Sequence, residues 1–274
     1  MINLSKDHKI KSSYFKNINE KNKYSQKLKN CEICGKKNFV TFQAVGRIGK
    51  PLEYGKLNVV ICKTCSHKFT NPRYQDSFYK KYYKSNYRKI AFGDLEPSKE
   101  YQKFQILRGK SVCNYFTKKI KLDKGVMLDH GCASGLTMIP WIKKKWEAIG
   151  IDPHKPSVKL GINKYNLNIK NAFGEKLPFN EKKFDVILSL GSLEHSYNLK
   201  KSLSEIKRTL KKNGYLLIRW RSSDLIGSPL EYYNHNHYRF FTRKTWDLLL
   251  KSHGFTSIKH INKDIEGYKS YLYI

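Results

Sequence analysis

The stretch VMLDHGCASG, residues 126–135, decides the fold of this chain of 274 residues. Its first half is apolar and ends in Asp129, as a buried strand often does, and its second half contains Gly131 and Gly135. Glycine adopts backbone angles that other residues avoid, so the chain can turn sharply at Gly131 and approach a ligand closely at Gly135. A strand followed by a glycine-rich turn and a helix is typical of a nucleotide-binding α/β domain.

A second acid follows at the interval that such a domain requires. The segment AIGID has the pattern of a strand that ends in Asp152, 23 residues after Asp129. A carboxylate there can accept hydrogen bonds from both hydroxyls of a ribose, and the alternative is a helix N-cap. Ala133 stands where a middle glycine is usual, which costs little if its backbone torsions are ordinary.

Strand-like and helix-like segments alternate from residue 126 onward. This alternation predicts an α/β fold, a Rossmann-like, doubly wound sheet of seven strands that is mostly parallel. The last strand should be antiparallel, because little chain separates it from the strand before it. The expected strands are 126–130, 147–151, 167–172, 184–189, 214–220, 255–262 and 268–274. The expected helices are 98–120, 135–145, 156–164, 198–211 and 242–253.

Two CxxC pairs precede this domain, Cys31 with Cys34 and Cys62 with Cys65. Two such pairs supply four thiolates, which is the ligand set of a closed tetrahedral zinc site. We therefore predict structural Zn²⁺ in a small zinc-ribbon-like unit with a sheet between the pairs. Free thiols in two chance pairs are the alternative, and His67 is a less favoured substitute ligand.

The later motifs resemble those of the class I S-adenosylmethionine-dependent methyltransferases. The chain has LPF at 177–179, LEH at 193–195 and LKKNGYLLI at 210–218, in the order of that family. The resemblance covers residues 98–274 and implies S-adenosylmethionine as the cofactor. By position it implies these cofactor-binding residues: Asp129, Gly131, Cys132, Ala133 and Gly135 at the methionine part, Asp152 at the ribose, Ala172 and Phe173 at the adenine, and Leu190 near the sulfonium.

The front half resembles the N-terminal zinc domain of bacterial sugar methyltransferases. The resemblance lies in the two CxxC pairs, LNVVIC at 57–62, FTNPR at 69–73 and the tyrosines that follow. It implies methylation of a sugar or nucleotide sugar in surface polysaccharide or deoxysugar biosynthesis. We favour O-methylation over sugar C-methylation, because Asn234 and Asn236 stand where the C-methyltransferase branch has Tyr and Glu. The candidate bases at the ends of strands are His195, His235 and His237. The arginines expected near a substrate diphosphate are Arg219, Arg221, Arg239 and Arg243.

The predicted organisation has four parts. They are a basic N-terminal extension at 1–30, a four-cysteine zinc-binding domain at 31–73, an aromatic helical linker or lid at 74–97 and the methyltransferase domain at 98–274. The tyrosines of the linker, Tyr79, Tyr82, Tyr83 and Tyr87, have the spacing of one helical face.

The net charge of +32 comes from 54 Lys and Arg against 22 Asp and Glu. The excess is mostly Lys spread along the chain, which indicates compositional bias on solvated faces. A basic surface would also attract a phosphorylated substrate or nucleic acid. A zinc-containing rRNA or nucleic-acid methyltransferase therefore remains an alternative, although no Asn-Pro-Pro-Tyr-like tetrapeptide follows the fourth strand. A non-catalytic scaffold is a further alternative.

The sequence has no apolar run near the ~20 residues of a membrane span, and its start lacks the apolar stretch of a secretory signal. We therefore expect a cytoplasmic protein without a transmembrane segment. Thiols stay reduced in that compartment, which agrees with metal-binding cysteines.

Overall fold

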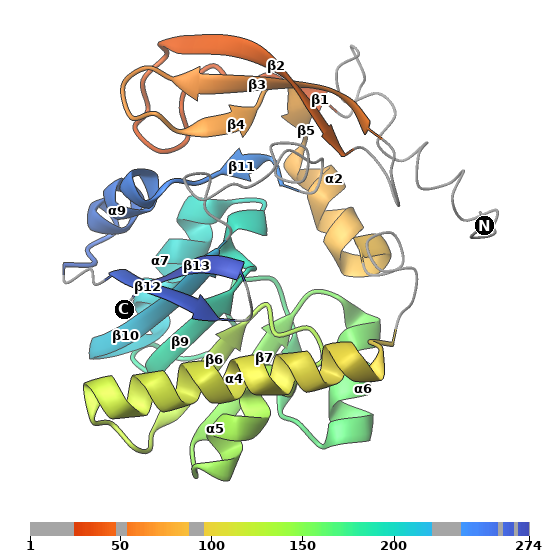
Figure 1. Cartoon of the computed structure of the whole chain (residues 1–274), viewed down its shortest axis with the longest axis vertical. Coiled ribbons are helices and arrows are strands. Elements are labelled where there is room, and N and C mark those ends of the chain that lie inside the picture. Colours follow the sequence, from red (N-terminus) through yellow and green to blue (C-terminus); the bar gives the residue numbers. More distant parts are fainter. Residues whose placement is uncertain are drawn as a thin grey trace. The chain divides into compact units, whose positions relative to one another are not determined.

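The computed structural model describes residues 25–47, 54–87, 96–220, 237–256, 260–265 and 268–273 (Figure 1). The chain forms two compact units. The first unit is Met1–Tyr82 with Ser222–Ser252, and the second is Tyr83–Arg221 with His253–Ile274. This division differs from the predicted four parts above all at residues 222–252, which join the first unit although they lie within the predicted methyltransferase domain.

A seven-stranded sheet forms the centre of the second unit, in the order β12-β13-β10-β9-β6-β7-β8. The five strands β10, β9, β6, β7 and β8 are parallel, and β13 is antiparallel to both β10 and β12. The predicted α/β sheet with an antiparallel last strand is confirmed. Its strands are β6 Val126–His130, β7 Glu147–Asp152, β8 Ile169–Asn171, β9 Phe184–Leu190, β10 Leu210–Trp220, β12 His260–Ile265 and β13 Tyr268–Tyr273.

The central strands of this sheet are apolar almost throughout. Met127 and Leu128 of β6 and Val186 to Leu188 of β9 are fully buried, because helices cover a parallel sheet on both faces. The helices of the second unit are α4 Lys99–Ile120, η2 Leu136–Met138, α5 Ile139–Lys143, α6 Lys155–Tyr165, η3 Leu193–His195 and α7 Leu199–Thr209. The segment at 135–145 was expected to be one helix. It forms the short 3-10 helix η2 followed by α5.

Strand β6 marks the point at which the strand order of the sheet reverses. The chain proceeds from β6 to β7 and β8 on one side, and from β9 to β10 on the other. In open parallel sheets ligands bind outside the carboxyl ends of the strands at such a point. The carboxyl ends of β6, β7 and β9 are therefore the place to examine for a site.

The first unit contains a four-stranded antiparallel sheet, in the order β11-β4-β3-β2, and a two-stranded sheet of β1 and β5. The hairpin β2–β3 lies between the two CxxC pairs, as expected. The elements of this unit are β1 Ser25–Gln26, β2 Phe39–Arg47, β3 Tyr54–Cys62, β4 Lys68–Thr70, β5 Arg73–Tyr74, α2 Asp76–Lys81, β11 Arg239–Phe240 and α9 Arg243–Ser252.

The tyrosine-rich segment does not form one regular helix. Helix α2 continues into a π-helical turn, η1 Tyr82–Asn86, whose wider turn changes which side chains share a face. Tyr79 and Tyr82 are buried, whereas Tyr83 and Tyr87 are half-buried. The prediction of a single helical face was wrong in this respect. Among the described residues, no helix has the length and apolar character that a membrane crossing requires.

Candidate active site

The glycine turn after β6 folds back against β7. The backbone N–H groups of Gly131 and Cys132 both donate to the carbonyl oxygen of Ile151, at 2.9 and 3.0 Å. Gly131, Ala133 and Gly135 all have a positive φ, of 79°, 51° and 76°. The backbone torsions of Ala133 are therefore not ordinary, and alanine at this position carries a cost in conformational energy. An added Cβ at Gly135 would lie 2.7 Å from Met138 Cε, so the close approach at Gly135 is to the protein's own core.

Asp152 lies at the end of β7 beside this turn. Its Oδ2 accepts the N–H of Ala133 and its Oδ1 accepts the N–H of His154, each at 2.8 Å. The N-cap of α6 is His154, whose side chain accepts from Ser157, so Asp152 is not the cap. The carboxylate is half-buried and is held by two backbone donors, one of them from the glycine turn.

Asp129, at the end of β6, is buried with 2% exposure. The hydroxyl of Thr137 donates to its Oδ2. Burial raises the pKa of Asp129 to about 6, while the Thr137 hydrogen bond and the charge of Arg108 act to lower it. A buried carboxylate next to the turn is suited to bind a cationic group.

Arg108, on α4, is the main residue that the sequence analysis missed. It is buried with 7% exposure and donates from Nη2 to the carbonyl oxygen of Leu190. Gly109 makes this placement possible, because a Cβ on Gly109 would overlap the carbonyl oxygen of Thr137. Gly191 follows Leu190 with a φ of 81°, and a Cβ there would have nothing nearer than Glu194 Oε1 at 3.9 Å and Arg108 Nη2 at 4.0 Å. The side of Gly191 next to Arg108 is therefore open.

Ala172 and Phe173 follow the short strand β8. The N–H of Ala172 donates to the carbonyl oxygen of Asp152 at 3.3 Å, and so does the Asn171 amide at 2.9 Å. Phe173 packs edge-to-face on Tyr197, with ring centroids 5.7 Å apart. Both rings are half-buried, so they offer an apolar edge beside Asp152. Tyr197 has no motif of its own in the sequence and is a second residue that was missed.

His195 ends the 3-10 helix η3, five residues after β9. Its Nδ1 lies 2.9 Å from the hydroxyl oxygen of Tyr83, and the two rings are 5.6 Å apart. Both residues belong to the second unit. Of the other two predicted bases, His237 precedes β11 in the first unit and His235 lies outside the described residues, so the three histidines are not shown to share one site.

A methyltransferase-domain family model matches residues 101–260, more than half of the chain. The chain belongs to the methyltransferase domain family. The chain is 35% identical over 106 residues to a ubiquinone biosynthesis O-methyltransferase of Pelagibacter ubique, a match that covers 37% of this chain and 42% of that protein. It is 29% identical over 117 residues to a sterol 4-C-methyltransferase of Caenorhabditis elegans, with 40% and 35% covered. The chain thus spans less than half the length of either relative.

Solved structures to which the chain is similar include the YcgJ protein of Bacillus subtilis and the protein mmp1179 of Methanococcus maripaludis. The first is 19% identical, with a TM-score of 0.46 and 55% of this chain and 70% of that chain covered. The second is 14% identical, with a TM-score of 0.49 and coverage of 73% and 91%.

The residues at this edge of the sheet fit S-adenosylmethionine. Arg108 lies next to the open side of Gly191, and its charge acts on Asp129, so the two supply the opposite charges that an amino acid with an ammonium and a carboxylate requires. Asp152 and the Phe173–Tyr197 pair follow along the same edge of the sheet, where a nucleoside would extend.

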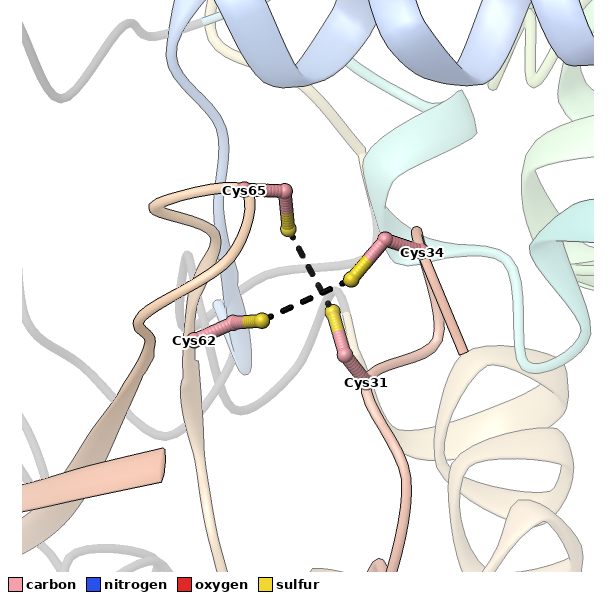
Figure 2. A group of neighbouring side chains, drawn as sticks. All are labelled: Cys31, Cys34, Cys62 and Cys65. Carbon is pink, nitrogen blue, oxygen red and sulfur yellow. Dashed lines mark hydrogen bonds between the residues drawn. The ribbon is translucent and has the colours of Figure 1, made fainter. Parts of the chain in front are cut away.

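The four cysteines of the first unit come together (Figure 2). All four Sγ atoms lie within 4.8 Å of one another, with Cys31 to Cys65 at 3.6 Å and Cys34 to Cys62 at 3.5 Å. Four thiolates around one ion at Zn–S distances of ~2.3 Å would lie slightly under 4 Å apart. The two CxxC turns have the same hydrogen bond. Gly35 N–H donates to the carbonyl oxygen of Cys31, and Ser66 N–H donates to the carbonyl oxygen of Cys62, each at 2.8 Å.

Arg239 does not have the role predicted for it. It is buried with 4% exposure, and its Nε donates to Glu32 in the first CxxC turn at 2.8 Å. Arg73 donates to the same carboxylate at 2.9 Å. Arg239 is therefore a structural residue of the first unit and is not available to bind a diphosphate. Arg221 lies outside the described residues.

Proposed function

We propose that this methyltransferase transfers a methyl group from S-adenosylmethionine to a hydroxyl of a sugar or nucleotide sugar. The observation that carries the proposal is the position of His195, which follows β9 on the edge of the sheet that also holds Asp129 and Asp152. The choice of a sugar rests on the resemblance of the four-cysteine unit to the zinc domain of sugar methyltransferases.

The cofactor supplies a methyl group that is already activated by the positive charge on sulfur. Asp129 would hold its ammonium, Arg108 its carboxylate and Asp152 its ribose hydroxyls. Ala172, Phe173 and Tyr197 would enclose the adenine, and Leu190 would lie near the sulfur. These residues orient the methyl group and exclude water from it, which lowers the entropic cost of an in-line transfer.

An imidazole is a suitable base for a hydroxyl acceptor, because its ordinary pKa is close to neutral pH. Carbon methylation remains the nearest alternative, since the relatives include both O- and C-methyltransferases. A second acceptor class is a hydroxylated aromatic compound, which the similarity to ubiquinone biosynthesis O-methyltransferases favours.

The four-cysteine cluster would bind Zn²⁺ in a structural role. All four ligands come from the protein, and three of them are buried, so no open coordination position remains for a substrate. The neighbouring Glu32, Arg73 and Arg239 would support the first CxxC turn from outside the ligand shell.

The test is methyl transfer from labelled S-adenosylmethionine to three separate pools: nucleotide sugars, small phenols and total RNA. We expect label in the nucleotide sugars, reduced at least 100-fold in His195→Ala and unchanged in His253→Ala. Label in the phenols alone would show that the acceptor is an aromatic hydroxyl and not a sugar. Label in RNA would give the net charge of +32 a direct role in substrate binding.

A further inference from the structure

One contact of the second unit is not explained by the fold or by cofactor binding. The hydroxyl of Tyr83, in the π-helical turn η1, lies 2.9 Å from Nδ1 of His195. The two residues are 112 positions apart in the sequence. π-helical turns occur often at functional sites, because the wider turn places a side chain where a regular helix would not.

Two tilted ring contacts also hold the Tyr83 ring in place. The Tyr83 ring lies 5.6 Å from the His195 ring and 5.2 Å from the Tyr87 ring, each tilted by 55°. Tyr83 and His195 are both half-buried, so neither ring is sealed in the core. Such a contact fixes the orientation of the imidazole while leaving part of it exposed.

We propose that Tyr83 is the positioning residue for His195, and this proposal rests on the proposed function. The Tyr83 hydroxyl oxygen accepts the Nδ1–H of His195. The neutral imidazole then carries its proton on Nδ1 and has its lone pair on Nε2. A hydrogen bond to one ring nitrogen determines the tautomer, and with it which nitrogen can act as a base.

With this tautomer, His195 can accept the proton that the acceptor hydroxyl loses during methyl transfer. The acceptor O–H bond breaks and its proton goes to Nε2 of His195. The oxygen forms a bond to the methyl carbon, and the carbon–sulfur bond breaks with its electron pair going to sulfur, which yields S-adenosylhomocysteine and a methyl ether. Tyr83 neither gains nor loses a proton, and it stabilises the imidazolium that forms.

The test is nitrogen-15 NMR of the histidine rings in the chain of 274 residues, with His195→Gln to assign the signals. In the wild type we expect the Nδ1–H tautomer at His195. In Tyr83→Phe we expect a shift toward the Nε2–H tautomer, because the partner of Nδ1 is lost. The matched control is Tyr165→Phe, which removes a hydroxyl that donates to Gln102 at 2.6 Å elsewhere in the same unit. It should leave the His195 signals unchanged.

The kinetic arm uses the nucleotide-sugar pool. Tyr83→Phe should lower kcat at least tenfold and change the KM for S-adenosylmethionine less than twofold. An unchanged His195 tautomer in Tyr83→Phe overturns this proposal whatever the acceptor is. A shifted tautomer without any sugar methylation would overturn the proposed acceptor and leave the role of Tyr83 intact.

Discussion

At the scale of single residues, Ala133 is a strained position within the glycine turn. Its φ of 51° lies in the left-handed region, which costs a residue with a Cβ roughly 1–2 kcal/mol. Ala133→Gly should therefore raise the free energy of unfolding by about 0.5–1 kcal/mol, after the greater flexibility of glycine in the unfolded chain is subtracted. Urea denaturation measures this change.

The matched control for that change is Gly131→Ala in the same turn. Its φ is 79° and its Cβ would overlap Ser192 Cβ, so this variant should lose stability. A loss of stability in Ala133→Gly would show that the methyl group of Ala133 makes a contact worth more than its strain.

Asp129 and His130 are adjacent, buried and shifted in opposite directions. Burial raises the pKa of Asp129 to about 6 and lowers the pKa of His130 to about 4. Neither ring nitrogen of His130 has a hydrogen-bond partner within the described part of the chain. As the pH falls from 6.5 to 4, protonation of Asp129 stabilises the native state, because the pKa of Asp129 is higher in the native state than in the unfolded chain. His130 destabilises the native state over the same range, because it stays neutral in the native state and is protonated in the unfolded chain.

Each residue changes the free energy of unfolding by about 2–3 kcal/mol between pH 6.5 and 4, so the two changes largely offset each other in the wild type. Asp129→Asn should therefore lose about 2–3 kcal/mol more than the wild type between pH 6.5 and 4, and His130→Leu should lose correspondingly less. Urea denaturation at pH 6.5, 5 and 4 checks both. Identical pH slopes in all three proteins would contradict the assignment.

At the scale of elements, the approach of α4 to η2 positions Arg108. A Cβ at Gly109 would overlap Thr137, whose hydroxyl donates to Asp129. Gly109→Ala should lower the free energy of unfolding by about 1–3 kcal/mol, although alanine is the better helix former. It should also weaken S-adenosylmethionine binding at least tenfold, since Arg108 would move with the helix. Isothermal titration calorimetry measures the affinity.

Lys110→Ala is the control, because Lys110 is exposed on the same helix. It should change neither quantity appreciably. If Gly109→Ala retained full affinity, the carboxylate of the cofactor would not depend on the position of α4.

The elements themselves were largely predictable, because apolar runs and glycine turns are local signals. The strands from β6 to β10 and the four-cysteine cluster followed from such signals. Arg108 did not, because nothing near it in the sequence shows that its helix lies against Thr137. Arg239 was misassigned for the same reason, since its partner Glu32 is 207 residues away. Tyr83 was grouped with the other tyrosines of its stripe, because sequence spacing does not show a π-helical turn.

At the scale of the whole molecule, metal removal should affect the two units differently. The four cysteines and the Glu32–Arg239 contact belong to the first unit, whereas Asp129, Asp152 and Arg108 belong to the second. Removal of the proposed Zn²⁺ should increase hydrogen exchange at residues 25–47 and 237–252 and change the affinity for S-adenosylmethionine less than threefold. Exchange mass spectrometry and calorimetry measure the two effects.

Cys62→Ser should reproduce the loss of metal, whereas Cys113→Ala, at a buried cysteine of α4 outside the cluster, should keep one Zn²⁺ per chain. A large loss of cofactor affinity on metal removal would instead show that the cofactor residues depend on the first unit.

The first unit is discontinuous, and this has a consequence during synthesis. The edge of β4 that pairs with β11 has no partner on the ribosome until about 170 further residues have been made, which takes roughly 10–30 s. The parallel strands β6 to β10 emerge within that interval, while β12 and β13 emerge only after α9. A nascent chain that stalls before residue 237 therefore carries an open sheet edge in each unit, at β4 and at β10, because β11 and β13 have not yet been made.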